Sequence, residues 1–383
     1  MEPPVSNPLL FVTNDFGPRS GGIETMVIGL LHHRPFGQTI VYTSSQVDSE
    51  KYDADWLEKY GIRVIRDRSK ILLPTPRVAF SLRRIIQSEG ITTAAFGAAA
   101  PLGLLSASMK RAGVLRIVAI THGHEVWWAK VFPFNLLLRR IGSTVDVLTY
   151  LGEFTRNAIS HGLTVQAQQS MVKIAPGIDV EHFLPTDASA LRKSLGLTEK
   201  KVIVSVGRLV HRKGQDRLIE AMPEILKTVS NAHLLLVGEG PHRDHLQKLI
   251  QKHRLEGSVT LIGRIDYKDL PLYICVGDVF AMPSRSRLMG LEVEGLGIVY
   301  LEASACGLPV LAGNSGGAPD AVVQNETGLV VDGTNNKEIA DAAIELLTKV
   351  DLSTKMGAAG RQWIVENWRW EIWSRSFEDL LNK

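Results

Sequence analysis

Cysteine is scarce in this chain of 383 residues, which contains only Cys275 and Cys306. Both lie in segments that we expect to be buried, so the sequence excludes a disulfide-rich scaffold and favours a reducing, cytoplasmic compartment. We also expect no secretory leader, because no basic segment precedes an apolar run near Met1. The uncharged residues 91–109 are mostly Ala, Gly, Ser and Thr and include Pro101, which predicts a strand, a turn and a helix rather than a membrane span.

Net charge is low as well, at +3, and does not by itself indicate a nucleic-acid partner. The basic residues are unevenly placed, because residues 63–84 contain seven of them and a single acid, Asp67. The seven are Arg63, Arg66, Arg68, Lys70, Arg77, Arg83 and Arg84. Such a stretch is either a solvated helix face or a surface for an anionic partner such as an acceptor, a membrane or a polyanion.

Apolar runs and helical patterns alternate along both halves of the chain, which predicts parallel sheets covered by helices. Strands are expected at residues 9–13, 38–43, 63–65, 92–96, 117–121, 145–150, 202–206, 233–237, 259–262, 279–282 and 309–312. The pattern restarts after the Pro176-Gly177 turn. We therefore expect an α/β chain of two Rossmann-like domains, residues 1–174 and 175–362, whose strand ends face an inter-domain cleft.

Four tryptophans lie close together near the end of the chain, at positions 363, 368, 370 and 373. Aromatic residues at such spacing usually pack against apolar surface. They predict a C-terminal helix within residues 363–383 that packs back on the first domain.

Two glutamates, Glu294 and Glu302, bracket a glycine-rich turn and an apolar run. A helix that begins near Gly297 has unpaired N–H groups at its start, and these favour an anion. Each carboxylate can accept hydrogen bonds from two vicinal hydroxyls, so one glutamate can hold a sugar ring and the other a ribose. The alternative, an amphipathic helix with incidental acids, does not account for the full pattern.

A basic loop, residues 207–214, lies between a predicted strand and a predicted helix. Arg208 can bind a phosphate through its planar guanidinium, and Lys213 can bind it as a point charge. Fixed cations of this kind stabilise a departing nucleoside diphosphate. The hypothesis of a reaction that expels a nucleoside diphosphate therefore requires that these cations and the amides near Gly297 bind the same pyrophosphate.

Two weaker patterns lie at strand ends in the first half. Gly21 and Gly22 precede a helix, where backbone amides can approach a phosphate closely. His122 and His124 can donate hydrogen bonds to a sugar or to developing charge. No metal is expected, because the two histidines lack further ligands nearby and Asp53-Ala54-Asp55 is better explained by helix capping.

Together these stretches are similar to the retaining glycosyltransferases of family 4, which have the GT-B fold, over essentially the whole chain. The Glu294–Glu302 string with Ala303, Gly307 and Pro309, and the Gly-Arg…Lys-Gly loop, carry this resemblance. Residues 285–297 (RSRLMGLEVEGLG) and the THGHEVWW sequence resemble the actinobacterial phosphatidylinositol-mannoside mannosyltransferase branch. That implies GDP-mannose as donor, a phosphatidylinositol monomannoside as acceptor, an α-1,6 linkage and no required cofactor.

The resemblance also implies roles for individual residues. The implied catalytic residues are His122, Arg208, Lys213 and Glu294. The implied donor-binding residues are Gly21, Gly22, Arg208, Lys213, Ile262, Gly263, Arg264, Glu294, Gly295, Leu296, Gly297, Ile298 and Glu302. Glu294 would hold the mannose, Glu302 the ribose, and the backbone at 262–264 the base. Leu296 departs from the family, in which many members carry Phe.

A lipid acceptor with a phosphodiester would explain why the residues between 63 and 84 are so basic, because it lies at an anionic membrane. We expect them to form the acceptor and membrane surface, and the protein to associate peripherally with the anionic cytoplasmic face of the plasma membrane. Three alternatives stay open at this point. They are a family 4 hexosyltransferase with a soluble acceptor, a sugar-nucleotide epimerase, and a non-catalytic nucleotide- or polyanion-binding module.

Overall fold

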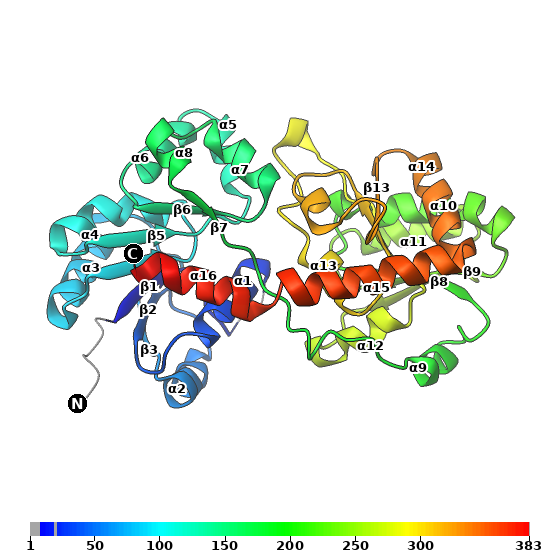
Figure 1. Ribbon diagram of the computed structural model, residues 1–383, viewed down its shortest axis with the longest axis horizontal. Helices are drawn as coiled ribbons and strands as arrows, with labels where there is room; N and C mark the ends of the chain where they lie inside the picture. Colours follow the sequence, from blue (N-terminus) through cyan, green and yellow to red (C-terminus); the bar gives the residue numbers. More distant parts are fainter. Residues whose placement is uncertain (1–7, 19–20, 383) are drawn as a thin grey trace. The chain divides into compact units, whose positions relative to one another are not determined.

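The computed structural model describes residues 8–18 and 21–382, and the chain divides into two compact units (Figure 1). The first unit comprises Met1–Gly177 and Trp370–Lys383, and the second comprises Ile178–Arg369. These boundaries differ from the expected 174/175 and 362/363. The second boundary moves because α15 (Val350–Asn367) continues past residue 362 as part of the second unit.

The first unit is built on a seven-stranded parallel sheet in the order β3-β2-β1-β4-β5-β6-β7. Its strands are β1 (Leu9–Thr13), β2 (Thr39–Thr43), β3 (Arg63–Arg66), β4 (Thr93–Phe96), β5 (Arg116–Ala119), β6 (Val147–Tyr150) and β7 (Met171–Lys173). Every residue of β1 is buried, as expected for a central strand covered by helices on both faces. The strand order reverses between β1 and β4, so the loops that follow these two strands diverge.

Apart from the C-terminal helix, the helices of the first unit lie in the connections between its strands. They are α1 (Gly22–His32), α2 (Ser49–Tyr60), α3 (Pro76–Glu89), α4 (Ser106–Ala112), α5 (Glu125–Lys130), α6 (Phe134–Gly142), α7 (Glu153–Ser160), α8 (Val165–Gln169) and α16 (Trp370–Asn382), with the 3-10 turn η1 (Leu102–Leu105). Figure 1 shows α16, in red, beside α1. Phe377 of α16 makes an edge-on ring contact with Phe11 of β1 at 6.3 Å between centroids.

The second unit repeats the plan with a six-stranded parallel sheet in the order β10-β9-β8-β11-β12-β13. Its strands are β8 (Lys201–Val206), β9 (Ala232–Val237), β10 (Val259–Gly263), β11 (Val279–Met282), β12 (Val310–Gly313) and β13 (Gly328–Val331). Its helices are α9 (Ser189–Ser194), α10 (Gln215–Thr228), α11 (Arg243–Lys252), α12 (Leu270–Cys275), α13 (Ile298–Ala305), α14 (Asn336–Thr348) and α15, with the 3-10 turns η2 (His211–Lys213), η3 (Tyr267–Asp269), η4 (Leu288–Gly290) and η5 (Ala318–Ala321). Here the strand order reverses between β8 and β11.

The expected pair of parallel, Rossmann-like sheets is confirmed, as is the strand, turn and helix within residues 91–109. Two strands, β7 and β13, were not expected. The capping account of the Asp53-Ala54-Asp55 sequence is wrong, because both acids lie inside α2 and the residue before that helix is Asp48. Asp53 instead forms a two-oxygen ion pair with Arg66, with both N···O distances at 2.7 Å.

The tryptophans near the C-terminus divide between the two units. Trp363 packs edge-on against Trp368 in the second unit, with ring centroids 5.4 Å apart. Trp370 packs in the first unit, where a Cβ on Gly29 of α1 would come within 2.1 Å of its ring. A side chain at position 29 would therefore displace α16 from α1.

Candidate functional site

The second unit gathers the predicted donor-binding residues at the carboxyl edge of its sheet. The loop after β8 carries Arg208 and Lys213, and the loop after β11 carries Glu294 and leads into α13. These loops flank the point where the strand order reverses, which is where ligands bind in open parallel sheets. Gly214 allows the loops to meet, because it adopts a φ of +76° and a Cβ there would lie 2.1 Å from the Pro283 carbonyl oxygen.

Lys213 and Glu294 form an ion pair. The Lys213 Nζ lies 2.8 Å from Glu294 Oε2, and the two residues are only 8% and 7% exposed. Although the charges are close, Glu294 Oε2 has no well-directed hydrogen bond to any described residue. A carboxylate oxygen can accept more than one hydrogen bond, so this one can take a ligand hydroxyl as well as the charge of the lysine. The arrangement therefore suits a hydroxyl donor beside the lysine.

The charge of Lys213 also acts on Glu302. Burial raises the pKa of its carboxyl from 4.5 to about 7, and the charge of Lys213 opposes this rise. One lysine thus acts on both glutamates of the string. Tyr267 belongs to the same neighbourhood, because burial and then the charges of Glu302 and Asp179 raise the pKa of its phenol.

The first turn of α13 supplies backbone donors next to these side chains. Gly297 precedes the helix with a φ of +81°, and a Cβ there would lie 2.4 Å from the Tyr300 ring. Glycine is therefore required at this turn. The Tyr300 N–H donates to the Gly297 carbonyl at 3.0 Å, whereas the N–H groups of Ile298 and Val299 lie before the first acceptor of the helix. The helix start that the sequence predicts to favour an anion is therefore present. Leu296, the departure from the family, is buried at this turn.

The other predicted donor residues lie on neighbouring strand ends. Arg208 is exposed, and its guanidinium forms no hydrogen bond or ion pair with the described part of the chain. Gly263 ends β10, Ile262 precedes it, and Arg264 follows it in an exposed position. Since β10 adjoins β9 and β9 adjoins β8, these residues share one sheet edge with Arg208.

A buried ion pair that the sequence analysis missed fixes the two loops to each other. Arg285, which follows β11, donates to both oxygens of Asp216 in α10, at 2.9 and 2.6 Å. Its backbone N–H also donates to the Arg212 carbonyl at 2.8 Å. Arg285 therefore holds the loop of Lys213 against the loop of Glu294. Asp216, three residues after Lys213, was visible in the sequence as an acid beside the basic loop. Its partner Arg285 is 69 positions away, so the sequence does not indicate the pair.

In the first unit, His122 is held tightly at the carboxyl end of β5. Its Nε2 is hydrogen-bonded to the Gly97 carbonyl, and its backbone N–H donates to Glu125 Oε2 at 3.0 Å. Burial lowers the pKa of the imidazole, and the charge of Glu125 partly opposes this. With Nε2 as the donor to a carbonyl, Nδ1 is left as an acceptor. His124 lies nearby, with its Nε2 at 3.1 Å from the Ala100 carbonyl oxygen.

The glycine pair lies at the start of α1 on the same sheet edge. Gly21 precedes the helix in an extended conformation, and a Cβ on it would lie 2.5 Å from Glu24 Oε2. Gly22 has open space where its Cβ would be. The loop that contains the glycine pair follows β1, and His122 follows β5, so both lie at the carboxyl edge of the first sheet.

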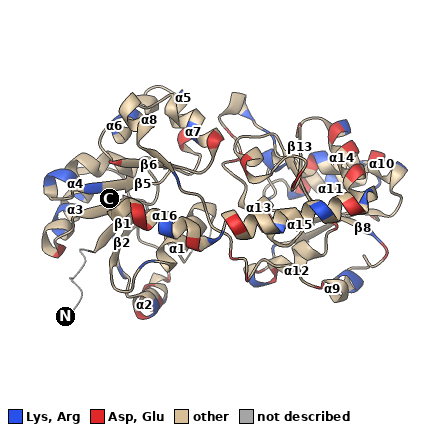
Figure 2. Ribbon diagram, viewed as in Figure 1, with Lys and Arg blue, Asp and Glu red and all other residues tan. Residues whose placement is uncertain are grey.

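The seven basic residues between positions 63 and 84 separate into two groups. Three are neutralised within the fold: Arg63 by Glu89 at 2.7 Å, Arg66 by Asp53, and Arg77 by Asp67 at 2.7 Å. Arg68, Lys70, Arg83 and Arg84 are exposed, and their side chains form no ion pair with the described residues. Figure 2 marks the Lys and Arg positions along the ribbon in blue. Exposed apolar residues lie among them, namely Ile71, Leu73 and Phe80.

Comparisons with known proteins identify the family of the chain. The family model described as glycosyl transferases group 1 matches residues 187–363. A Mycobacterium tuberculosis protein, GDP-mannose-dependent alpha-(1-6)-phosphatidylinositol monomannoside mannosyltransferase, is 43% identical, and the match covers 97% of each chain. A Corynebacterium glutamicum protein, GDP-mannose-dependent monoacylated alpha-(1-6)-phosphatidylinositol monomannoside mannosyltransferase, is 40% identical over 98% of each chain.

The fold is shared with more distant proteins of known structure. Anabaena HepE, solved in complex with UDP, matches with a TM-score of 0.81 at 19% identity, covering 98% of this chain and 99% of that chain. A sucrose-phosphate synthase from Thermosynechococcus elongatus matches with a TM-score of 0.77 at 20% identity, covering 97% of this chain and 98% of that chain. These likenesses confirm the architecture.

Proposed function

The chain belongs to the group 1 glycosyltransferases, the retaining family 4 enzymes of GT-B fold, and on that premise we propose that it transfers mannose from GDP-mannose to a phosphatidylinositol monomannoside in an α-1,6 linkage. The reaction belongs to phosphatidylinositol mannoside and lipoglycan biosynthesis. One observation supports the proposal most directly. A buried lysine, Lys213, acts on the two carboxylates of the string beside a helix start whose amides favour an anion.

The residues of the second unit have distinct tasks in this reaction. Lys213, Arg208 and the amides after Gly297 stabilise the charge that grows on the diphosphate as the glycosidic bond breaks. Glu294, whose Oε2 lies 2.8 Å from the Lys213 Nζ, accepts hydrogen bonds from mannose hydroxyls and fixes the ring. Front-face attack, in which the departing phosphate oxygen deprotonates the acceptor, accounts for retention. Glu294 is then a positioning group rather than a covalent nucleophile.

The first unit supplies the remaining polar groups. His122 offers its Nδ1 as an acceptor to a sugar hydroxyl, in the tautomer that its bond to Gly97 favours. Gly21 and Gly22 offer backbone amides to the diphosphate.

The nucleotide test uses calorimetric titration of the full-length protein with GDP, UDP and ADP, followed by transfer assays with the sugars of the nucleotide that binds best. We expect GDP to bind most tightly and GDP-mannose to be consumed only when a phosphatidylinositol monomannoside is present. Preference for UDP or ADP, or epimerisation without an acceptor, would overturn the proposal. We expect turnover to persist in EDTA, since the reaction as proposed needs no metal or other cofactor.

The acceptor class separates the proposal from its nearest rival, a hexosyltransferase with a soluble acceptor. A cavity of about 500 Å³ lies in the first unit and is lined by Pro18, Ser45, Gln46, Val47 and Lys70. These residues follow the carboxyl ends of β1, β2 and β3, and Lys70 supplies a cation for a phosphodiester. The proposal requires that the deacylated headgroup be a poorer substrate than the lipid, whereas a soluble-acceptor enzyme would not distinguish them.

The raised pKa of Glu302 predicts that donor affinity depends on pH. Ribose hydroxyls donate to the ionised carboxylate, so binding lowers its pKa and releases a proton wherever the free protein holds one. Because the free pKa is about 7, affinity should rise with pH up to that value and then level off. GDP-mannose should bind about ten-fold more weakly at pH 6 than at pH 8.

Calorimetry in buffers of different ionisation enthalpy measures both the affinity and the proton released. The Glu302→Gln variant provides the control, because it cannot titrate. Its affinity should be lower than that of the wild type at pH 8 and independent of pH. A pH dependence that persists unchanged in this variant would refute the assignment.

Membrane association is the second part of the proposal. Among the described residues, no helix has the length and hydropathy needed to cross a bilayer. The exposed surface of Arg68, Lys70, Arg83 and Arg84 with Ile71, Leu73 and Phe80 instead combines cations with apolar side chains. Such a surface suits peripheral binding to the anionic cytoplasmic face of the plasma membrane.

Neutralising two cations of this surface, with Arg83→Gln and Arg84→Gln, should weaken binding to anionic vesicles roughly 30-fold, since each basic residue contributes about 1 kcal/mol. The matched control, Lys248→Gln and Lys252→Gln on α11, should bind as the wild type does. Co-sedimentation with vesicles at low salt measures the effect. Equal losses in both variants would show a nonspecific charge effect and contradict the assignment of this surface.

A further inference from the structure

A short helical hairpin that follows β5 in the first unit carries two exposed apolar side chains at its tip. This α5–α6 hairpin consists of α5, the turn at residues 131–133 and α6, and its two helices lie side by side (Figure 1). Phe132 in the turn is 75% exposed, and Leu136 near the start of α6 is 54% exposed. The proposed transfer reaction uses neither side chain, so their exposure needs a separate explanation.

The base of the α5–α6 hairpin is well packed. The Phe134 ring lies edge-on to the rings of Trp127 and Trp128, with centroids 4.7 and 5.2 Å apart. On the inner face of α6, Leu138 and Ile141 are fully buried in the core of the first unit. The packed base therefore holds the exposed tip in place.

The outer face of α6 changes from apolar to cationic within one helical turn. Arg139 and Arg140 follow Leu136 by three and four positions, are exposed, and form no side-chain ion pair with the described residues. The whole segment 126–145 contains no Asp or Glu. The arginines stand about 6 Å behind Leu136 along the helix, which is comparable with the depth of about 5–10 Å to which interfacial helices bury their apolar face.

This arrangement suits a lipid surface better than a second protein. An apolar tip can enter the acyl chains while the cations behind it reach lipid phosphates. A stable protein interface buries about 800 Å² on each partner, whereas one aromatic side chain supplies only about 150–250 Å². Two side chains at a narrow tip therefore fall well short of a protein interface, and the charge of the segment favours an anionic membrane.

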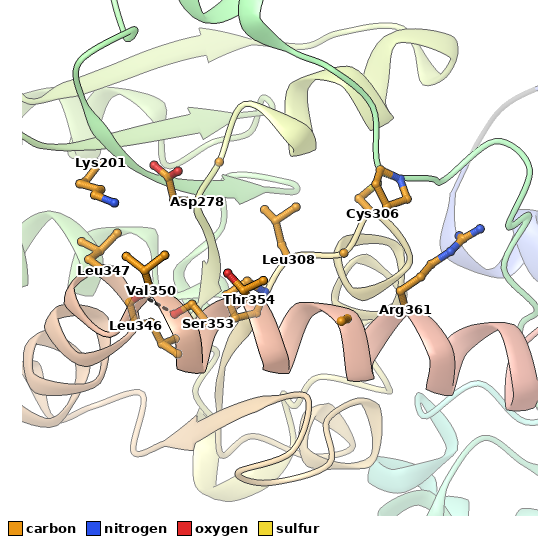
Figure 3. Close-up of a pocket in the computed structure, with 15 residues that line it drawn as sticks. Lys201, Asp278, Cys306, Leu308, Leu346, Leu347, Val350, Ser353, Thr354 and Arg361 are labelled. Carbon is orange, nitrogen blue, oxygen red and sulfur yellow. Dashed lines mark hydrogen bonds between the residues drawn. The ribbon is translucent and has the colours of Figure 1, made fainter.

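A cavity in the second unit is the other apolar surface to consider for the tails of a lipid. It has a volume of about 560 Å³, and Leu308, Leu346 and Leu347 are among its lining residues (Figure 3). Lys201 and Asp278 also line it and lie at the amino ends of β8 and β11, so the cavity is at the sheet edge opposite the donor residues. Tails held there would keep the headgroup away from the donor residues. The α5–α6 hairpin instead begins at the carboxyl edge of its own sheet.

We propose that the α5–α6 hairpin inserts its tip into the acyl layer of the membrane that carries the acceptor, an assignment that rests on the proposed function. Phe132 and Leu136 lie among the acyl chains, and the two arginines behind them bind lipid phosphates. The hairpin is also tied to the site, because the His122 backbone N–H donates to Glu125, the first residue of α5, at 3.0 Å. Insertion therefore brings the histidine to the membrane surface, where the acceptor headgroup lies.

Vesicle binding tests the insertion directly with the full-length protein. The double variant Phe132→Ser, Leu136→Ser should bind vesicles of phosphatidylglycerol and phosphatidylcholine about 30-fold more weakly than the wild type, because the burial of two large apolar side chains is lost. This loss should persist at about 1 M salt, where charges are screened beyond about 3 Å. The loss caused by Arg83→Gln with Arg84→Gln should disappear at that salt concentration, because it is electrostatic.

The matched control is the double variant Phe36→Ser, Leu115→Ser, which replaces one Phe and one Leu that are 69% and 76% exposed. These residues precede β2 and β5 and so lie at the amino edge of the same sheet, and the control should bind vesicles as the wild type does. Thermal unfolding should be unchanged in both double variants, because the replaced side chains are exposed. Equal losses in the two, or no loss in the hairpin variant, would overturn the proposal. A wild-type dimer that the hairpin variant converts to a monomer in sedimentation would also overturn it, in favour of a second copy of the chain.

Kinetics distinguish a failure of the insertion from a failure of the proposed function. The hairpin variant should show a KM for the lipid acceptor raised about ten-fold with kcat unchanged, the pattern of lost uniform binding. Its residual rate with the deacylated headgroup should equal that of the wild type, because this substrate needs no membrane. A slower rate with the deacylated headgroup would show that the hairpin acts on the reaction itself and would overturn the proposal. Absence of transfer by the wild type would be a failure of the proposed function, and the vesicle measurement would still decide the insertion.

Discussion

Replacing Lys213 by Ala is expected to lower kcat for mannose transfer by about 10²- to 10³-fold, the range seen when one preorganised donor to a developing charge is removed. The lysine is 8% exposed and lies 2.8 Å from Glu294, so its charge acts where water cannot screen it. The Arg212 Nε is 3.8 Å from the same carboxylate and does not replace it. Initial rates of GDP release with saturating lipid acceptor measure the loss.

The same substitution leaves two carboxylates, Glu294 and Glu302, without their lysine. In the wild type the charge of Lys213 holds down the pKa of Glu302, which burial raises to about 7. Without the lysine this pKa should rise further. Thermal unfolding must be recorded beside the kinetics to separate misfolding from lost charge. Lys213→Arg should recover part of the rate, and Lys248→Ala on α11 should match the wild type. A Lys213→Ala enzyme that keeps its fold and its kcat would refute the role of this lysine.

The strands were largely predictable from the sequence, because buried parallel strands are short continuous apolar runs bounded by turn residues. Strand β1, with every residue buried, is such a run. Strand β7 was missed because it has only three residues, Met171–Lys173, and none of them is fully buried. Strand β13 was missed although three of its four residues are apolar and Val331 lies in the hydrophobic core. It begins at Gly328, where a Cβ would lie 2.1 Å from the Val310 carbonyl oxygen, and glycine is uncommon in strands.

The candidate site was predictable where its residues are close in sequence or match a family pattern, as Lys213 and the Glu294–Glu302 string do. Contacts between distant loops were not. Arg285 meets Asp216 across 69 positions, and nothing in either segment alone indicates the partner. The ion pairs of the basic residues 63–84 were also not predictable, because their partners are distant in sequence. Their charge was visible in the sequence, but the acids that neutralise Arg63 and Arg66, namely Glu89 and Asp53, lie outside that segment.

Replacing Glu294 by Gln should separate sugar positioning from diphosphate binding. The amide keeps the shape but weakens the acceptance of mannose hydroxyls, so kcat/KM for GDP-mannose should fall about 10²-fold. GDP has no mannose, and the substitution frees Lys213 from its ion pair. GDP affinity should therefore be unchanged or slightly higher, as calorimetry can measure.

Glu292→Gln is the matched control, because that carboxylate pairs with Arg287 at 2.9 Å and lies two residues from Glu294. Its kinetics should stay within about two-fold of the wild type. The double variant Lys213→Ala, Glu294→Gln should lose less than the product of the two single losses, since contacting residues in one charge network are not additive. If the Glu294→Gln enzyme lost GDP affinity and turnover in equal proportion, Glu294 would be holding the nucleotide rather than the sugar. Multiplicative losses in the double variant would mean that the ion pair seen in the free protein has no part in the reaction.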